Sequence, residues 1–235
     1  MFDALFFEPI LALLKSIYSN VAFSDLGIAI ILLTILIRVV LFPFFYRSAK
    51  DQALMRKIQP HVEKIKQKHK NNREEQGRAL MELYREHKLN SFYSFLISLV
   101  QLPIFFALFK LFRDSEFLAE TFINTTFLGM LQLSTPSIML AVVAGALQYI
   151  QGKLSLGKQK NQTKGGTQRF IVMMIYFAPI LSFVVLIRLP AALGIYWVIS
   201  TLFSIGQQFM INKKLESKNE EYERKNTKNG GVNGV

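Results

Sequence analysis

A run of twenty residues, LGIAIILLTILIRVVLFPFF at positions 26–45, contains only two polar side chains, Thr34 and Arg38. At about 1.5 Å per residue, a helix of this length spans the roughly 30 Å hydrocarbon core of a bilayer. The run therefore predicts a membrane-spanning helix, and it requires an account of the arginine inside it.

Arg38 lies seven residues before Phe45. That separation is roughly 10 Å along a helix, so a snorkelling guanidinium does not fully reach the interface. A charge facing lipid at this depth costs about 2.5 kcal/mol or more, so such residues face protein or trapped water and usually mark a functional site. The alternative is a snorkelling arginine that only orients the span.

Composition agrees with a membrane protein, since 51% of the 235 residues are hydrophobic, 21 are phenylalanine and the formal net charge is +12. The basic residues lie between the hydrophobic runs, so positive-inside topology explains the charge without a nucleic-acid partner. The sequence has no cysteine, which excludes disulfides, thiolate metal sites and a lipidated cysteine. We also expect no cleavable signal peptide.

Apolar runs predict five spans within a core of residues 20–213, at about residues 26–45, 92–112, 136–154, 170–187 and 190–211. Residues 1–19 are apolar but interrupted by charges and a proline, which favours an amphipathic helix in the membrane interface. Residues 214–235 are charged and rich in glycine and asparagine, which predicts a disordered cytoplasmic tail.

Residues 46–90 carry 12 basic and 6 acidic residues, with apolar side chains at helical spacing on both sides of a polar turn at 70–73. This pattern predicts an antiparallel helical hairpin in the cytoplasm. The hairpin, residues 152–169 and the tail from residue 212 hold 23 of the 28 Lys and Arg residues. The positive-inside rule then places the N-terminus outside, the C-terminus inside and Arg38 in the cytoplasmic half of the bilayer.

Polar side chains recur inside three of the predicted spans. Thr34 and Arg38 share one helix face, and Gln148 and Gln151 lie near the end of the third span. The fifth span carries a polar stripe at three- and four-residue spacing, consisting of Trp197, Ser200, Thr201, Ser204, Gln207 and Gln208. Such hydroxyls can simply bond their own helix or pack helices together. Because no span contains an acidic partner for Arg38, we favour a shared hydrated cavity.

The sequence carries no catalytic or cofactor motif. All three histidines lie in the predicted hairpin without partners at metal-ligand spacing, and there is no nucleophile motif or phosphate loop. We therefore expect a protein that is not an enzyme and that uses no cofactor or metal.

Four motifs carry a resemblance to a known family: QP at 59–60, ELYREHKLN at 82–90, QLPIFFALF at 101–109 and LPAALGIYWVISTLFSIGQQ at 189–208. In this order they resemble the YidC-type membrane protein insertases, which have mitochondrial and chloroplast relatives, and the likeness covers about residues 20–213. The chain departs from the family where Ser91 replaces the usual proline and where FLG at 127–129 replaces the usual tryptophan.

The resemblance implies an all-α membrane protein in which five transmembrane helices surround a hydrophilic groove, located in the bacterial plasma membrane. Its implied substrates are nascent membrane proteins with one or two spans and short, often acidic external segments. The partners that the resemblance implies are the lipid bilayer and the Sec translocon, with weak or transient ribosome contact. Arg38 then attracts the translocating segment, and Gln148 and Trp197 line the groove. Thr34, Gln151 and Ser200 are added from helical spacing alone.

Two other classes are considered. A small-solute transporter could use Arg38 as an anion site, but its expected internal repeats or paired broken helices are not found in the sequence. A membrane chaperone or assembly scaffold beside the Sec translocon, without insertion activity of its own, is the principal alternative.

Overall fold

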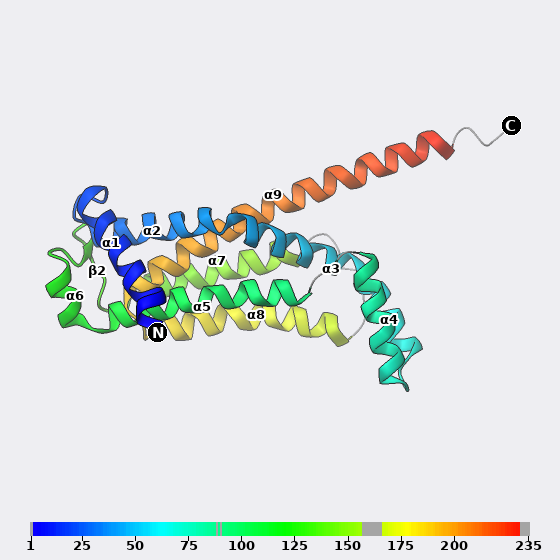
Figure 1. Cartoon of the computed structure of the whole chain (residues 1–235), viewed down its shortest axis with the longest axis horizontal. Helices are drawn as coiled ribbons and strands as arrows, with labels where there is room; N and C mark the ends of the chain where they lie inside the picture. Colours follow the sequence, from blue (N-terminus) through cyan, green and yellow to red (C-terminus); the bar gives the residue numbers. More distant parts are fainter. Residues whose placement is uncertain (1, 88, 90, 157–165, 231–235) are drawn as a thin grey trace.

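The computed structural model describes residues 2–87, 89, 91–156 and 166–230. Long helices run side by side along the molecule (Figure 1): α2 (Leu26–Val40), α5 (Ser91–Arg113), α7 (Ile138–Leu156), α8 (Gly166–Leu186) and α9 (Ala191–Gly230). Helix α9 contacts each of the other four, and α7 packs most extensively on α8 and α9. The fold is therefore a helical bundle organised around α9.

The two ends of the bundle differ. At one end, here called the hairpin end, α3 (Phe42–Lys68) and α4 (Arg73–Glu86) extend away from the long helices. At the other, the cap end, lie α6 (Ser115–Thr121) and a strand pair, β1 (Thr126–Phe127) and β2 (Leu131–Gln132), which pair antiparallel. No apolar run or periodic pattern in the sequence predicts structure in this cap.

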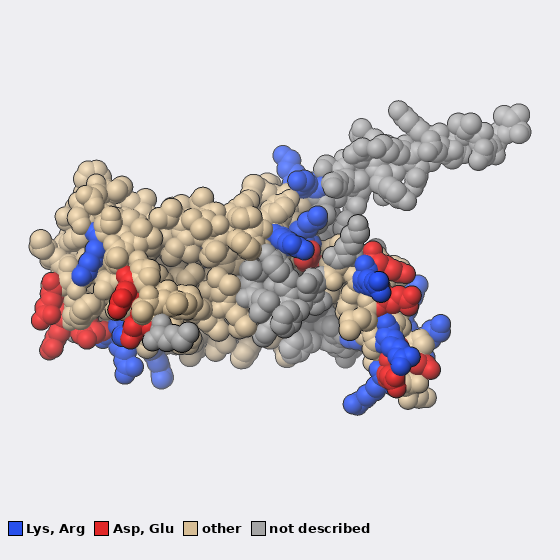
Figure 2. Space-filling view, viewed as in Figure 1, with Lys and Arg blue, Asp and Glu red and all other residues tan. Residues whose placement is uncertain are grey.

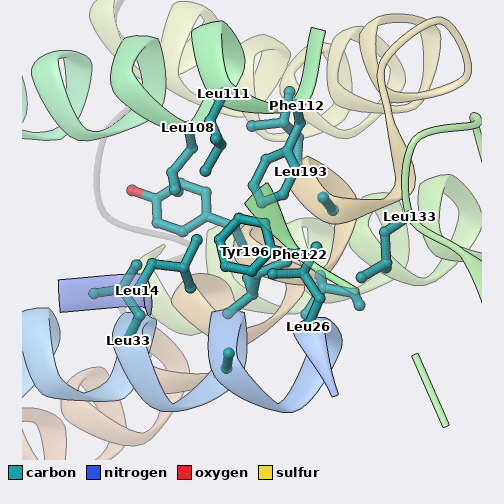
Figure 3. Close-up of a cluster of buried hydrophobic side chains, with 14 of the residues drawn as sticks. Leu14, Leu26, Leu33, Leu108, Leu111, Phe112, Phe122, Leu133, Leu193 and Tyr196 are labelled. Atoms are coloured by element: carbon teal, nitrogen blue, oxygen red, sulfur yellow. The ribbon is translucent and has the colours of Figure 1, made fainter. Parts of the chain in front are cut away.

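The N-terminal segment consists of a π-helical turn, η1 (Asp3–Phe7), and α1 (Glu8–Asn20). Helix α1 crosses the bundle axis at the cap end (Figure 1). Its Leu14 is fully buried and joins a cluster built from α1, α2, α5, α9 and the cap (Figure 3). Burial of these large aliphatic and aromatic side chains closes the cap end of the bundle.

The outward faces of the helices are apolar as well. Ile138 and Val142 on α7 and Ile180 on α8 are 69%, 54% and 61% exposed. Residues Ile138–Ser155 form an 18-residue stretch with a mean hydropathy of 1.2 that is long and apolar enough to cross a bilayer. Exposed apolar faces on long helices are those expected of a protein surrounded by lipid.

The first predicted span is not one straight helix. Helix α2 ends at Val40, α3 begins at Phe42, and the two helices bend by 67°. Pro43 in the first turn of α3 explains the break, because proline lacks the N–H that would continue the preceding helix and is tolerated in a first turn. Taken together, α2 and the start of α3 have the length and hydropathy of one broken span.

The predicted hairpin is formed by α3 and α4. Asn72 caps α4, since its Oδ1 accepts hydrogen bonds from the N–H groups of Glu74 at 3.1 Å and Glu75 at 3.2 Å. Ile58, Val62 and Leu83 are buried between the two helices. This small apolar contact holds the hairpin together, and the charges cover its outside (Figure 2).

The sequence predicts a disordered tail over residues 214–235, whereas the structure continues α9 as a helix to Gly230; residues 231–235 lie outside the described residues. The tail sequence is rich in Lys, Glu and Arg, which are good helix formers. Glu220 precedes Arg224, and Glu221 precedes Lys225, by four residues, a spacing that supports a helix. The charge content that suggested disorder therefore also suits an extended helix.

Candidate functional site: a polar cavity around Arg38

A cavity of about 420 Å³ lies between the long helices. All five contribute to its lining, which consists of Arg38, Gln101, Leu102, Phe105, Gln148, Gln151, Val185, Tyr196, Trp197, Ser200, Thr201 and Ser204. We call this space the polar cavity. Its size lies within the range of ligand-binding pockets.

Arg38 is only 8% exposed. Its Nη1 donates to Ser204 Oγ at 3.2 Å and its Nη2 donates to Gln101 Oε1 at 3.3 Å. The guanidinium also lies 4.8 Å from the centroid of the Phe45 ring, a cation–π distance. No carboxylate among the described side chains forms an ion pair with Arg38. Its positive charge is therefore surrounded by neutral partners, which do not neutralise it.

Gln101 connects Arg38 to the last helix. Its Oε1 accepts from Arg38, and its Nε2 donates to the Tyr196 hydroxyl. The amide therefore uses both ends to position the guanidinium. Sequence reasoning did not include Gln101 or Tyr196 in the site. The available signal was a glutamine two residues before Pro103 within an apolar span.

A second hydrogen-bond group lies across the cavity. Gln148 Oε1 accepts from Trp197 Nε1 at 3.3 Å and from the Ser182 hydroxyl. The Phe105 ring meets the Trp197 ring at 85°, with 6.0 Å between centroids. Side chains of α5 and α7 thus contact the indole, and Ser182 on α8 bonds the same glutamine. Ser182 is not among the site residues predicted from the sequence.

Five of the six predicted site residues line the polar cavity: Arg38, Gln148, Gln151, Trp197 and Ser200. Thr34 is not among the lining residues. Its Oγ1 donates to the Ile30 carbonyl at 2.6 Å and the residue is 1% exposed. The hydroxyl is therefore satisfied within α2, which is the ordinary behaviour of threonine in an apolar helix.

The cavity combines one positive charge with amides, hydroxyls and aromatic rings. Amides and hydroxyls can donate to or accept from a polar segment, and attraction to a carboxylate is stronger at low dielectric than in water. This fold and site define a class: a helical membrane protein with an uncompensated arginine in a polar cavity between its long helices.

Comparison with known proteins identifies the family. The sequence model of the family described as "60Kd inner membrane protein" matches residues 17–219. The chain belongs to this family, which comprises the YidC-type membrane protein insertases.

Relatives of similar length include the "Membrane protein insertase YidC" of Fusobacterium nucleatum subsp. nucleatum. It is 39% identical over 192 residues, covering 81% of this chain and 88% of the relative. The protein of the same name from Clostridium tetani is 37% identical over 214 residues, covering 91% and 92%. The one from Magnetococcus marinus is 33% identical over 210 residues, which cover 89% of this chain but 36% of that longer protein.

A solved structure supports the same assignment. The "Active YidC insertase crystal structure with the first transmembrane domain resolved" aligns with a TM-score of 0.58 at 27% identity. The match covers 87% of this chain and 45% of that chain. The helical bundle is therefore the family fold.

Proposed function

We propose that this protein is a membrane protein insertase that moves short, often acidic external segments of small membrane proteins across the bilayer through the polar cavity. The observation that carries the proposal is the buried Arg38 guanidinium, which lines the cavity and has only neutral partners among the described side chains. Membership of the insertase family supports it.

The physical scheme has two parts. A polar cavity within the bundle shortens the apolar distance that a hydrophilic segment must cross, because each unsatisfied polar group in hydrocarbon is costly. The charge of Arg38 attracts a carboxylate on the incoming segment. Since the neutral partners leave this charge uncompensated, a substrate carboxylate does not have to displace a resident one.

Release of the translocated segment requires that the attraction between Arg38 and the substrate carboxylate stay moderate. Two guanidinium N–H groups already donate to the neutral oxygens of Ser204 and Gln101. Fewer N–H donors therefore remain for the carboxylate of the substrate. Transfer of the substrate's apolar segment into lipid can then drive completion. The scheme needs no nucleotide.

Reconstitution tests this function against the alternative of a chaperone or scaffold without insertion activity. Purified protein in liposomes without Sec components receives a single-span substrate with a short acidic tail. We expect the tail to become protected from added protease in these liposomes and not in protein-free ones. Equal protection in both would refute independent insertion and favour the chaperone.

The proposed topology, with five spans and the hairpin in the cytoplasm, has its own test. The chain lacks cysteine, so single cysteines can be introduced at Glu116 on α6 and at Met81 on α4, both exposed. In intact cells an impermeant thiol reagent should label Glu116→Cys and not Met81→Cys, which should react only after lysis. Labelling of Met81→Cys in intact cells would contradict this topology.

A further inference from the structure

The cap end displays large apolar side chains that contribute nothing to the core. Phe23, Ile123 and Met130 are 94%, 98% and 90% exposed, and Val21 and Leu128 are 56% and 61% exposed. They lie on the α1–α2 loop, on the segment after α6 and around the β1–β2 turn. We call these five residues the apolar rim.

The loops that carry the rim are fastened to one another. Asp25 accepts from the N–H of Ile28 at 2.9 Å through Oδ1 and from the N–H of Leu128 at 2.6 Å through Oδ2. Tyr18 accepts from the N–H of Asn124 at 2.8 Å. Asp25 and Tyr18 are both buried, so these hydrogen bonds are shielded from water. They fix the backbone of the loops that carry the rim residues.

Two rim residues occupy a backbone conformation that suits other residue types. Phe23 has φ 51° and Leu128 has φ 52°, in the left-handed region that Gly, Asn and Asp adopt most readily. A bulky side chain there is strained without any gain from core packing. Such an outlier points to a role for the side chain itself.

The surroundings indicate what covers the rim. Helix α1 lies across the bundle axis and leads directly into Val21 and Phe23 (Figure 1), and its N-terminal neighbour Leu5 is 60% exposed. In Figure 2 the acidic side chains of the cap end lie in its lower half, whereas the corner over the α1–α2 loop shows no Lys, Arg, Asp or Glu. The rim therefore adjoins surface without charged side chains on this face.

We propose that the apolar rim inserts into the headgroup–acyl boundary of the bilayer leaflet at the cap end. The α1–α2 loop and the β1–β2 turn would then contact the same leaflet as the interfacial helix that the sequence predicts for residues 1–19. Apolar and aromatic side chains favour this boundary. The inference requires only that the protein lies in a bilayer, so it stands or falls separately from the insertase activity.

Site-specific fluorescence tests the proposal. Single cysteines at Phe23, Leu128 and Ile123 carry an environment-sensitive fluorophore in proteoliposomes of phosphatidylcholine and phosphatidylglycerol. Ile138→Cys, on the exposed face of α7, is the lipid control, and Glu120→Cys on α6 is the water control. We expect a nitroxide placed near the lipid headgroup to quench the rim labels several-fold more than the Glu120 label, and aqueous iodide to show the reverse order.

Rim labels that behave like the Glu120 label would overturn the proposal. Labels shielded from both quenchers, to an extent that grows with the protein-to-lipid ratio, would also overturn it, since a second copy of the chain would then cover the rim.

A paired variant separates anchoring from folding. The double variant Phe23→Asn, Leu128→Asn places asparagine, which tolerates the left-handed region, at both positions. The thermal unfolding midpoint should therefore not fall. A fluorophore on Val21→Cys in this background should lose lipid quenching several-fold and become accessible to iodide. Unchanged quenching would show that the two side chains do not hold the loop in the membrane.

Discussion

Arg38→Ala is expected to slow insertion of acidic-tailed substrates by about tenfold or more. Two opposite charges 4 Å apart attract by about 4 kcal/mol at an effective dielectric of about 20, and each 1.4 kcal/mol corresponds to about tenfold. Arg38 has no carboxylate partner among the described side chains, so its removal leaves no buried anion behind. The measurement is the rate of tail protection in Sec-free proteoliposomes at matched protein levels.

The Arg38→Lys variant separates charge from geometry. Lysine keeps the charge but not the fork that bonds Ser204 and Gln101, so it should retain much of the activity. Ser204→Ala removes one hydrogen bond to the guanidinium and should have a smaller effect than Arg38→Ala.

Substrate tails that differ only in their acidic residues provide the internal control, because neutral tails should be affected less by Arg38→Ala. If this variant inserts acidic tails at the normal rate, the electrostatic role is wrong. The arginine would then act in hydration or helix packing.

Gly27→Ala is expected to destabilise the protein by about 1–3 kcal/mol, the usual cost of overpacking. A Cβ at Gly27 would lie 2.3 Å from Phe127 Cδ2 and 2.5 Å from Phe127 Cβ. Because Phe127 Cβ is one of the clashing atoms, rotation of the phenylalanine ring alone does not relieve the clash. The β1–β2 pair must then move off α2, which should appear as a lower thermal unfolding midpoint in detergent.

Two variants control this prediction. Gly77→Ala on α4 meets no atom within 4 Å and improves helix propensity, so it should not lower the midpoint. Phe127→Ala combined with Gly27→Ala should recover part of the loss, since neighbouring substitutions are not additive. A Gly27→Ala protein as stable as the parent would show that the cap does not pack closely on α2.

Much of the molecule could be predicted from local patterns. Apolar runs located the long helices, and the alternation of charged and apolar residues located the α3–α4 hairpin, because helix length and periodicity are local properties. Arg38 was recognised because a charge in an apolar run is costly wherever the helix packs. Gln148 and Trp197 were assigned from the family resemblance.

Other features depend on contacts between distant segments, and composition does not encode them. Gln101 meets Arg38 across 63 residues, and Asp25 meets Leu128 across 103. Thr34 shares spacing with Arg38, yet its hydroxyl bonds its own helix in a buried environment. Hydropathy and spacing thus establish which segments are helical and which residues are unusual. Packing of the helices against α9 selects which polar side chains share a cavity, because the rotation and depth of each helix follow from contacts along its whole length.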